Sequence, residues 1–213
     1  MRSRFAILKF ILFYISLSSS SKVEYVGWWK RDFRSPAPHF VKMSILETAK
    51  NVDVWVETGT YMGQTTEVLS RNTSRVISIE PSLELAQRAK SLFSQNQNVQ
   101  IVNGLSENEL PSILEALPSN SFNIAFWLDG HYSEGPTHLG PIETPIVQEL
   151  RVIEAHVEKF QEVTIFIDDF RCFVNRQKDY PQTSFLSTWA DSNGMSWSVE
   201  HDIFIARKIQ TGI

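Results

Sequence analysis

The sequence predicts one α/β domain in which a mostly parallel, twisted sheet is flanked by helices and closes with an antiparallel C-terminal hairpin. Short apolar segments alternate with longer segments whose apolar residues recur every three or four positions, which is typical of strands joined by crossover helices. The length of 213 residues fits one domain, and 42% hydrophobic against 21% charged residues excludes a disordered chain. In such a sheet, the ligand site is expected in the crevice at the carboxyl ends of the strands.

Each expected element follows from local patterning. The apolar segments expected to form parallel strands are residues 52–57, 75–80, 99–102, 122–128 and 163–167. Helices are expected at residues 64–71, at 82–94, from 106 onward and from 146 onward, where apolar residues recur at helical spacing. Ser106 and Glu109 match a capping box at the start of the third helix, and Pro118 favours its end. Residues 197–201 and 203–207 are expected to form the closing hairpin, with Asp202 in its turn.

The N-terminus allows two interpretations. Residues 1–21 have the layout of a secretory signal peptide, with a basic start, an apolar middle and a run of serines. An N-terminal helix that covers the edge of the domain fits equally well. The uninterrupted apolar core, residues 10–17, is far shorter than the roughly 20 residues of a membrane-spanning helix, so no stable span is expected. Residues 22–51 are expected to be a linker or a helical cover, and residues 52–213 to form the main domain.

Charge and cysteine content exclude several kinds of partner and site. The formal net charge is −4 and the isoelectric point is about 5.8, so no bulk positive field favours nucleic acid or an anionic membrane. The single cysteine, Cys172, excludes an intramolecular disulfide framework and a cysteine-based zinc cluster. A small-molecule ligand is therefore the favoured partner.

The first two expected strands end in residues suited to a nucleotide-like ligand. Gly59 and Gly63 allow a tight turn that leads directly into a helix N-terminus, where a backbone can approach a ligand closely. Glu80 follows the second strand, 21 residues beyond Gly59, which is the spacing at which a carboxylate accepts hydrogen bonds from ribose hydroxyls. An exposed carboxylate at a helix start is the alternative for Glu80. Ser106 is expected to cap its helix and can also border an adenine pocket.

Three carboxylates follow the last two parallel strands. Asp129 comes after the fourth strand, and Asp168 and Asp169 come after the fifth. Like charges in one crevice raise one another's pKa, and a hard divalent cation offsets that cost because it prefers carboxylate oxygens. The residues therefore predict a metal site, with Mg²⁺ favoured and calcium or manganese also compatible with the ligands. The alternative is that one aspartate caps the next helix and another is solvated.

These motifs, taken in order, resemble a known family. The segments ETGTYMG, SIEPS, NGLS, WLDGHYSEGPT and IFIDDF are similar to those of class I S-adenosylmethionine-dependent methyltransferases. Within that group, LDGHY followed by IDDF most resembles the metal-dependent sugar O-methyltransferases of the macrocin O-methyltransferase type. The similarity covers about residues 52 to 208, which makes residues 52–213 the expected methyltransferase domain. It implies a Rossmann-like methyltransferase fold.

The resemblance also implies roles for individual residues. The loop around the methionine part of the cofactor S-adenosylmethionine would be formed by Glu57, Gly59, Thr60, Tyr61 and Gly63. Glu80 would hold the ribose, with Ser106 near the adenine.

The acceptor side of the site is implied in the same way. Asp129, Asp168 and Asp169 would bind Mg²⁺, which would orient the hydroxyls of a small-molecule or glycan acceptor. Asp129 or His131 would then be the general base. The cofactor is cytosolic, which favours a cytoplasmic protein, whereas the leader-like segment favours export.

Two other functions remain open at this stage. A metal-dependent hydroxylase on the same scaffold would need His131, Asp129 and a further histidine such as His138 to converge, since iron oxygenases use two histidines and one carboxylate. A catalytically silent domain that only binds the nucleotide is the other alternative. The sequence does not identify the acceptor or the oligomeric state.

Overall fold

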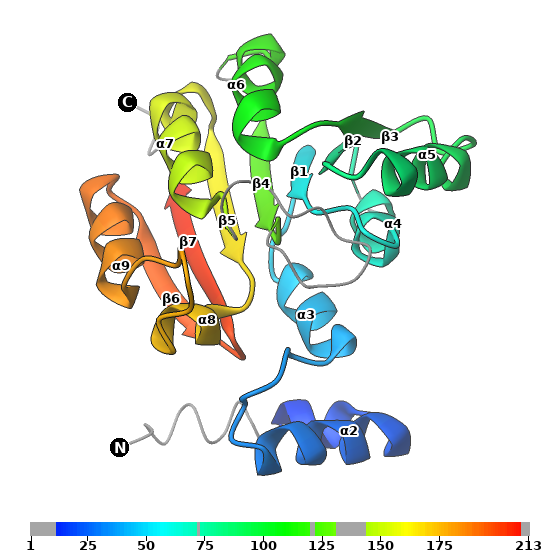
Figure 1. Cartoon of the computed structure of the whole chain (residues 1–213), viewed down its shortest axis with the longest axis vertical. Helices are drawn as coiled ribbons and strands as arrows, with labels where there is room; N and C mark the ends of the chain where they lie inside the picture. Colours follow the sequence, from blue (N-terminus) through cyan, green and yellow to red (C-terminus); the bar gives the residue numbers. More distant parts are fainter. Residues whose placement is uncertain (1–11, 72, 120–121, 131–143, 210–213) are drawn as a thin grey trace.

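The computed structural model describes residues 12–71, 73–119, 122–130 and 144–209. These residues form one β-sheet with helices packed on both faces. Within these residues, seven strands lie in the order β3-β2-β1-β4-β5-β7-β6 (Figure 1). The strands are β1 (Val54–Thr58), β2 (Arg75–Glu80), β3 (Val99–Asn103), β4 (Asn123–Leu128), β5 (Glu162–Ile167), β6 (Ser196–Glu200) and β7 (Ile203–Ile209). The helices are α2 (Ser19–Lys30), α3 (His39–Leu46), α4 (Gln64–Ser70), α5 (Leu83–Leu92), α6 (Ser106–Ala116), α7 (Ile146–His156), the 3₁₀ turn η1 (Val157–Lys159), α8 (Phe170–Val174) and α9 (Thr183–Ser192).

The strand directions confirm the predicted fold class. β1 pairs in parallel with β2 and β4, β2 pairs in parallel with β3, and β4 pairs in parallel with β5. β7 lies between β5 and β6 and runs antiparallel to both, which forms the C-terminal hairpin. The strand order reverses between β1 and β4, and ligands of open α/β sheets bind at this switch point.

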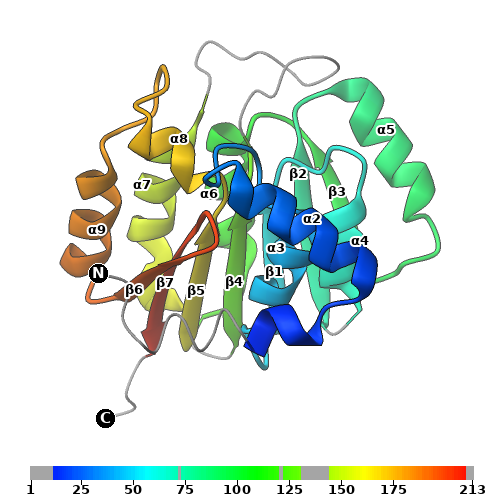
Figure 2. The same ribbon diagram turned by 90° about the horizontal axis from the view of Figure 1, so that it is seen from below.

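Two apolar cores cover the two faces of the sheet because successive residues of a strand point to opposite sides. Val56 and Phe126 face the core that contains residues of α6, α7 and α9. Trp55 and Trp127 face the other core, which contains residues of α2, α3 and α4. Figure 2 shows α2, α3 and α4 in front of the sheet, with α6 and α7 behind it.

Helix α2 and the described residues before it pack into the core that contains Trp55 and Trp127. Tyr25 and Trp28 of α2 are fully buried, and the hydroxyl of Tyr25 lies 2.7 Å from Nε2 of His201 in the β6–β7 turn. The ring of Phe13 lies 5.4 Å from that of Tyr25. This packing makes α2 and α3 a cover for the sheet and brings α3 to the strand ends. The boundary at residue 52 and the processing of residues 1–21 stay predictions.

The predicted elements agree with the observed ones within a few residues, with one error at the start of α6. Ser106 is the first residue of this helix and Leu105 occupies the N-cap, with no side-chain capping bond, so the predicted capping box is wrong. The Glu109 side chain instead packs over Gly104, where an added Cβ would lie 2.6 Å from its Cγ. Helices α8 and α9 were not predicted. In the described part of the chain, no helix is both long and apolar enough to cross a bilayer.

Candidate active site

The carboxyl ends of the central strands lie level with one another. Thr58 of β1 pairs with Leu128 of β4, and Leu128 pairs with Ile167 of β5. The residues that follow these three therefore meet at one edge of the sheet. The amide of Asp129 donates a hydrogen bond to the carbonyl of Thr58 at 3.1 Å, and the amide of Asp168 donates one to the carbonyl of Leu128 at 3.1 Å. The predicted convergence of the strand-end motifs is thus a property of the strand register.

The loop after β1 has the backbone shape that its glycines permit. Gly59 and Gly63 have φ values of 87° and 81°, and Tyr61 lies in the left-handed region as well at 47°. A Cβ at Gly59 would lie only 2.6 Å from the carbonyl oxygen of Asp129, so this close approach of two strand ends requires glycine. Gly63 is the N-cap of α4. Thr60 is buried and its hydroxyl lies 2.6 Å from that of Ser78.

A cavity of about 240 Å³ opens on this loop. It is lined by Ala37, His39, Lys42, Gly59, Thr60, Tyr61, Met62, Gln64, Thr65 and Asp129. Four of these, Gly59, Thr60, Tyr61 and Asp129, were predicted to be site residues. The three from the N-terminal cover, Ala37, His39 and Lys42, were not. The cover is therefore a wall of the cavity as well as a packing element.

Glu80 lies beside the glycine loop, where two backbone amides bind its carboxylate. Its Oε2 accepts a hydrogen bond from the amide of Tyr61 at 2.8 Å, and its Oε1 accepts one from the amide of Ser82 at 2.9 Å. Each carboxylate oxygen has a second lone pair, so both remain able to accept a ligand hydroxyl. The carboxylate thus ties the end of β2 to the loop after β1, although Glu80 is not among the residues that line the cavity, and its contact with a ribose stays a prediction.

Glu57 lies beneath the loop rather than in the lining of the cavity. Its carboxyl is fully buried, and Oε2 accepts hydrogen bonds from the hydroxyls of Thr66 at 2.5 Å and Ser78 at 2.6 Å. Burial raises the pKa of Glu57 from its ordinary 4.5 to about 8, so the group is mostly protonated at neutral pH. In this arrangement Glu57 supports the loop through α4 and β2. Ser106, at the start of α6, is buried and also lies outside the lining of this cavity.

The three aspartates form one cluster at the ends of β4 and β5. A carboxylate oxygen of each of Asp129, Asp168 and Asp169 lies within 4.8 Å of one from each of the others. Asp168 and Asp169 are buried, and Asp129 is half-buried. Burial raises the pKa of Asp168, and the charges of Asp129 and Asp169 raise it further. Such a group needs a cation close by.

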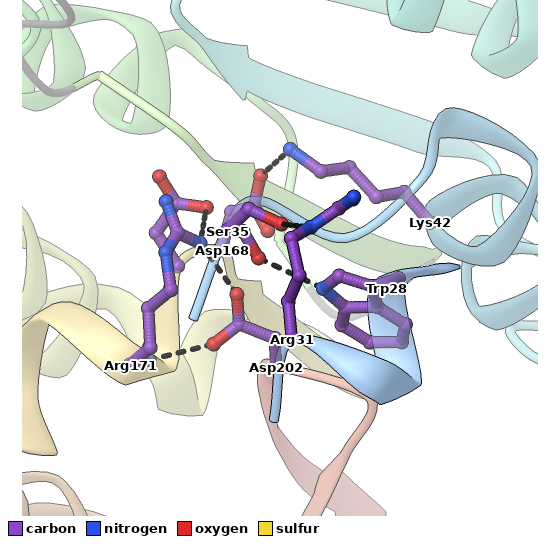
Figure 3. A network of polar contacts seen from close by, with 8 residues as sticks. Trp28, Arg31, Ser35, Lys42, Asp168, Arg171 and Asp202 are labelled. Carbon is purple, nitrogen blue, oxygen red and sulfur yellow. Dashed lines mark hydrogen bonds and ion pairs between the residues drawn. The ribbon is translucent and has the colours of Figure 1, made fainter. Parts of the chain in front are cut away.

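Two basic side chains reach the cluster from different sides (Figure 3). The ammonium of Lys42 on α3 donates to Oδ2 of Asp168. The guanidinium of Arg171 on α8 donates to Asp169 and, at 2.5 Å, to Asp202 in the β6–β7 turn. Arg171 therefore joins the end of β5 to the C-terminal hairpin.

The cluster also fits a divalent cation. The donor set is carboxylate oxygen, which Mg²⁺ prefers. Oδ1 of Asp168 is buried and has no hydrogen-bond partner among the described residues, although the opposite oxygen is bound by Lys42. A buried carboxylate oxygen left in this way costs free energy unless a ligand satisfies it. Asp129, Asp168 and Asp169 are the residues that would hold the ion.

Some predicted residues lie outside the described residues, and the sequence did not point to one residue that the structure brings to the site. His131, His138 and most of the glycine- and proline-rich segment after Gly130 fall in the range 131–143, so their roles stay predictions. Lys42 was missed because no motif surrounds it. The signal available was the cluster itself, since carboxylates gathered at one edge of the sheet imply cations somewhere in the chain.

The comparisons with known proteins agree with this fold. No family model matches the sequence, and neither does any curated protein. Among solved structures, an O-methyltransferase from Bacillus cereus in complex with S-adenosylhomocysteine (SAH) matches with a TM-score of 0.56 and 16% identity over 96% of this chain and 97% of that one. YcgJ from Bacillus subtilis matches with a TM-score of 0.51 and 16% identity over 75% and 70% of the chains. A candidate methyltransferase from Escherichia coli, yhhF, matches with a TM-score of 0.51 and 15% identity over 83% of this chain and 92% of that one. At these identities the likenesses show the fold: the chain has a Rossmann-like α/β architecture, which it shares with these structures.

Proposed function

We propose that the protein is an S-adenosylmethionine-dependent methyltransferase that acts on a hydroxyl of a small molecule or sugar. The single observation that carries this proposal is the common register of the strand ends. It brings the glycine loop after β1 beside Asp129 and, one strand further, Asp168. The loop proposed to bind the cofactor and the acidic cluster therefore share one edge of the sheet. The B. cereus O-methyltransferase, which has the same fold, was solved with SAH.

The cofactor would lie along the loop between Gly59 and Gly63. Glu80 would accept hydrogen bonds from the two ribose hydroxyls, since its oxygens are already fixed by backbone amides. Ser106 would border the adenine. Glu57 would keep the loop in place from beneath, through Thr66 and Ser78.

Methyl transfer would occur at the side of the loop that faces Asp129. The acceptor oxygen attacks the methyl carbon, the bond from that carbon to sulfur breaks, and the sulfonium becomes a neutral thioether. The acceptor proton passes to a carboxylate oxygen of Asp129, or to His131. When bound at Asp129, Asp168 and Asp169, a divalent ion such as Mg²⁺ supplies a Lewis acid that lowers the pKa of a coordinated hydroxyl.

The net charge bears on the kind of acceptor, and the cofactor bears on the location. A net charge of −4 gives no bulk positive field for nucleic acid, so we propose a small-molecule or glycan acceptor rather than a nucleic acid. We also propose a cytoplasmic location, because the cofactor is made and used there.

Isothermal titration with S-adenosylmethionine and SAH tests the cofactor half of the proposal. The wild type is expected to bind both in the micromolar range. Glu80→Ala is expected to weaken binding about 100-fold, since two hydrogen bonds to a charged group are lost. Glu84→Ala is the matched control, because Glu84 is close to Glu80 in the sequence but its side chain is exposed on α5.

The outcomes of this titration are distinct. Equal losses in both variants, or no binding by the wild type, would contradict the cofactor assignment. Binding of SAH without methyl transfer to any sugar or phenol acceptor would favour a silent binding domain.

A further inference from the structure

Lys42 brings a positive charge into the acidic cluster from a different part of the chain. It lies on α3, in the N-terminal cover, and its ammonium donates to Oδ2 of Asp168, which is 126 residues further along the sequence. The side chain of Lys42 is 15% exposed and that of Asp168 is 0% exposed. The ammonium also lies 5.9 Å from the ring centre of Trp127, near the end of β4. Solvent screening of this ion pair is therefore weak.

The ammonium of Lys42 interacts electrostatically with all three carboxylates of the cluster. Its ammonium is bonded to Asp168, which has a carboxylate oxygen within 4.8 Å of one from each of Asp129 and Asp169. Lys42 is therefore an ammonium at neutral pH. It serves as a cation of the cluster, and it is not suited to accept a proton from the acceptor.

Asp168 divides its two oxygens between two environments. Oδ2 is bound by Lys42, whereas Oδ1 is buried and lacks a hydrogen-bond partner among the residues described. An incoming divalent ion would therefore meet an ammonium bonded to one of its own ligands. Two cations that share one buried carboxylate repel each other strongly, because the surroundings screen them little.

We propose that Lys42 and a divalent cation compete for the acidic cluster, so that α3 sets the affinity of the metal site. The proposal rests on the metal-binding part of the proposed function. Removing the ammonium leaves the three carboxylates in place and increases the net negative charge that attracts the ion. The N-terminal cover thereby controls the acceptor half of the site, although it carries none of the carboxylates.

Titration of Mn²⁺ into the protein, followed by electron paramagnetic resonance of the free ion, tests this competition without any acceptor. Lys42→Met keeps an apolar chain over Trp127 and removes the charge. It is expected to bind Mn²⁺ about tenfold or more tightly than the wild type. Lys42→Arg keeps the charge and is expected to bind close to the wild type. Lys50→Met is the matched control, since Lys50 is exposed beyond the end of α3.

Two additions keep the result interpretable. Lys42→Gln is a second charge-removing variant if Lys42→Met does not fold, and thermal unfolding checks each protein. The double variant Lys42→Met with Asp168→Asn is expected to lose the tight binding.

Each outcome is decisive for the competition. Unchanged or weaker Mn²⁺ binding in the charge-removing variants would overturn it and leave Lys42 as a group that orients Asp168. If no variant binds Mn²⁺, both the competition and the metal part of the proposed function fail. The SAH titration would still report separately on the cofactor part.

Discussion

The backbone of Gly59 lies against the carbonyl of Asp129, with only 2.6 Å between that oxygen and a Cβ placed on the glycine. This contact joins the loop after β1 to the end of β4 at the switch point of the sheet. It brings the proposed cofactor loop to the proposed general base. At this contact, the approach of the two halves of the site is thus set by backbone packing.

Gly59→Ala is expected to destabilise the protein by about 3 kcal/mol or more, because the added Cβ meets backbone atoms that cannot rotate away. Gly194→Ala is the matched control. Gly194 also has a positive φ, of 64°, but a Cβ there meets nothing within 4 Å, so a cost of about 1 kcal/mol is expected. Urea unfolding of both variants measures the difference. Equal costs would mean that the approach of the two strand ends is not tight.

The stability of the protein is expected to fall as the pH rises from about 4.5 to about 8, because of Glu57. Its pKa is about 8 in the folded protein and near the ordinary 4.5 in the unfolded chain, so the folded state holds the extra proton in this window. At about 1.4 kcal/mol for each pKa unit, the loss is of order 4 kcal/mol. Glu57→Gln, which stays neutral, is expected to flatten this part of the curve. Chemical unfolding at a series of pH values measures it, and parallel curves for the two proteins would refute the buried, protonated state.

Arg171→Met is expected to cost about 3–5 kcal/mol, since it takes the nearest cation away from two buried carboxylates. Adding Asp202→Asn to the Arg171→Met variant removes one of these charges. The side-chain oxygen of the new asparagine can still accept a hydrogen bond from the backbone amide of residue 171, a bond of 2.6 Å in the wild type. The double variant is therefore expected to recover part of the loss. A double-mutant cycle by urea unfolding gives the coupling. Purely additive effects would show that Arg171 and Asp202 do not act as a pair.

The strands and the strand-end carboxylates could be predicted from local sequence. The apolar run that ends at Leu128 is long enough to be a buried parallel strand, and Asp129 follows it directly. Once the strands are parallel, their carboxyl ends must share an edge. The convergence of Asp129 with Asp168 and Asp169 therefore follows from pattern and topology alone.

The cations of the site could not be predicted in this way. Lys42 meets Asp168 only because Tyr25 and Trp28 fix the N-terminal cover against the sheet, and no sequence period records that packing. Arg171 meets Asp202 because β7 inserts beside β5. The wrong prediction that Ser106 caps α6 comes from a shift of one residue. The chain enters α6 one residue early, which moves the serine out of the capping position.

A crystal structure of the protein grown with SAH and Mn²⁺ tests the central claim most directly. We expect SAH along the loop from Gly59 to Gly63 with its ribose hydroxyls on Glu80. We also expect an anomalous manganese peak among Asp129, Asp168 and Asp169, with the Lys42 ammonium displaced from Asp168. SAH bound elsewhere, or a loop that stays empty at saturating SAH, would contradict the assignment of this edge of the sheet as a methyltransferase site.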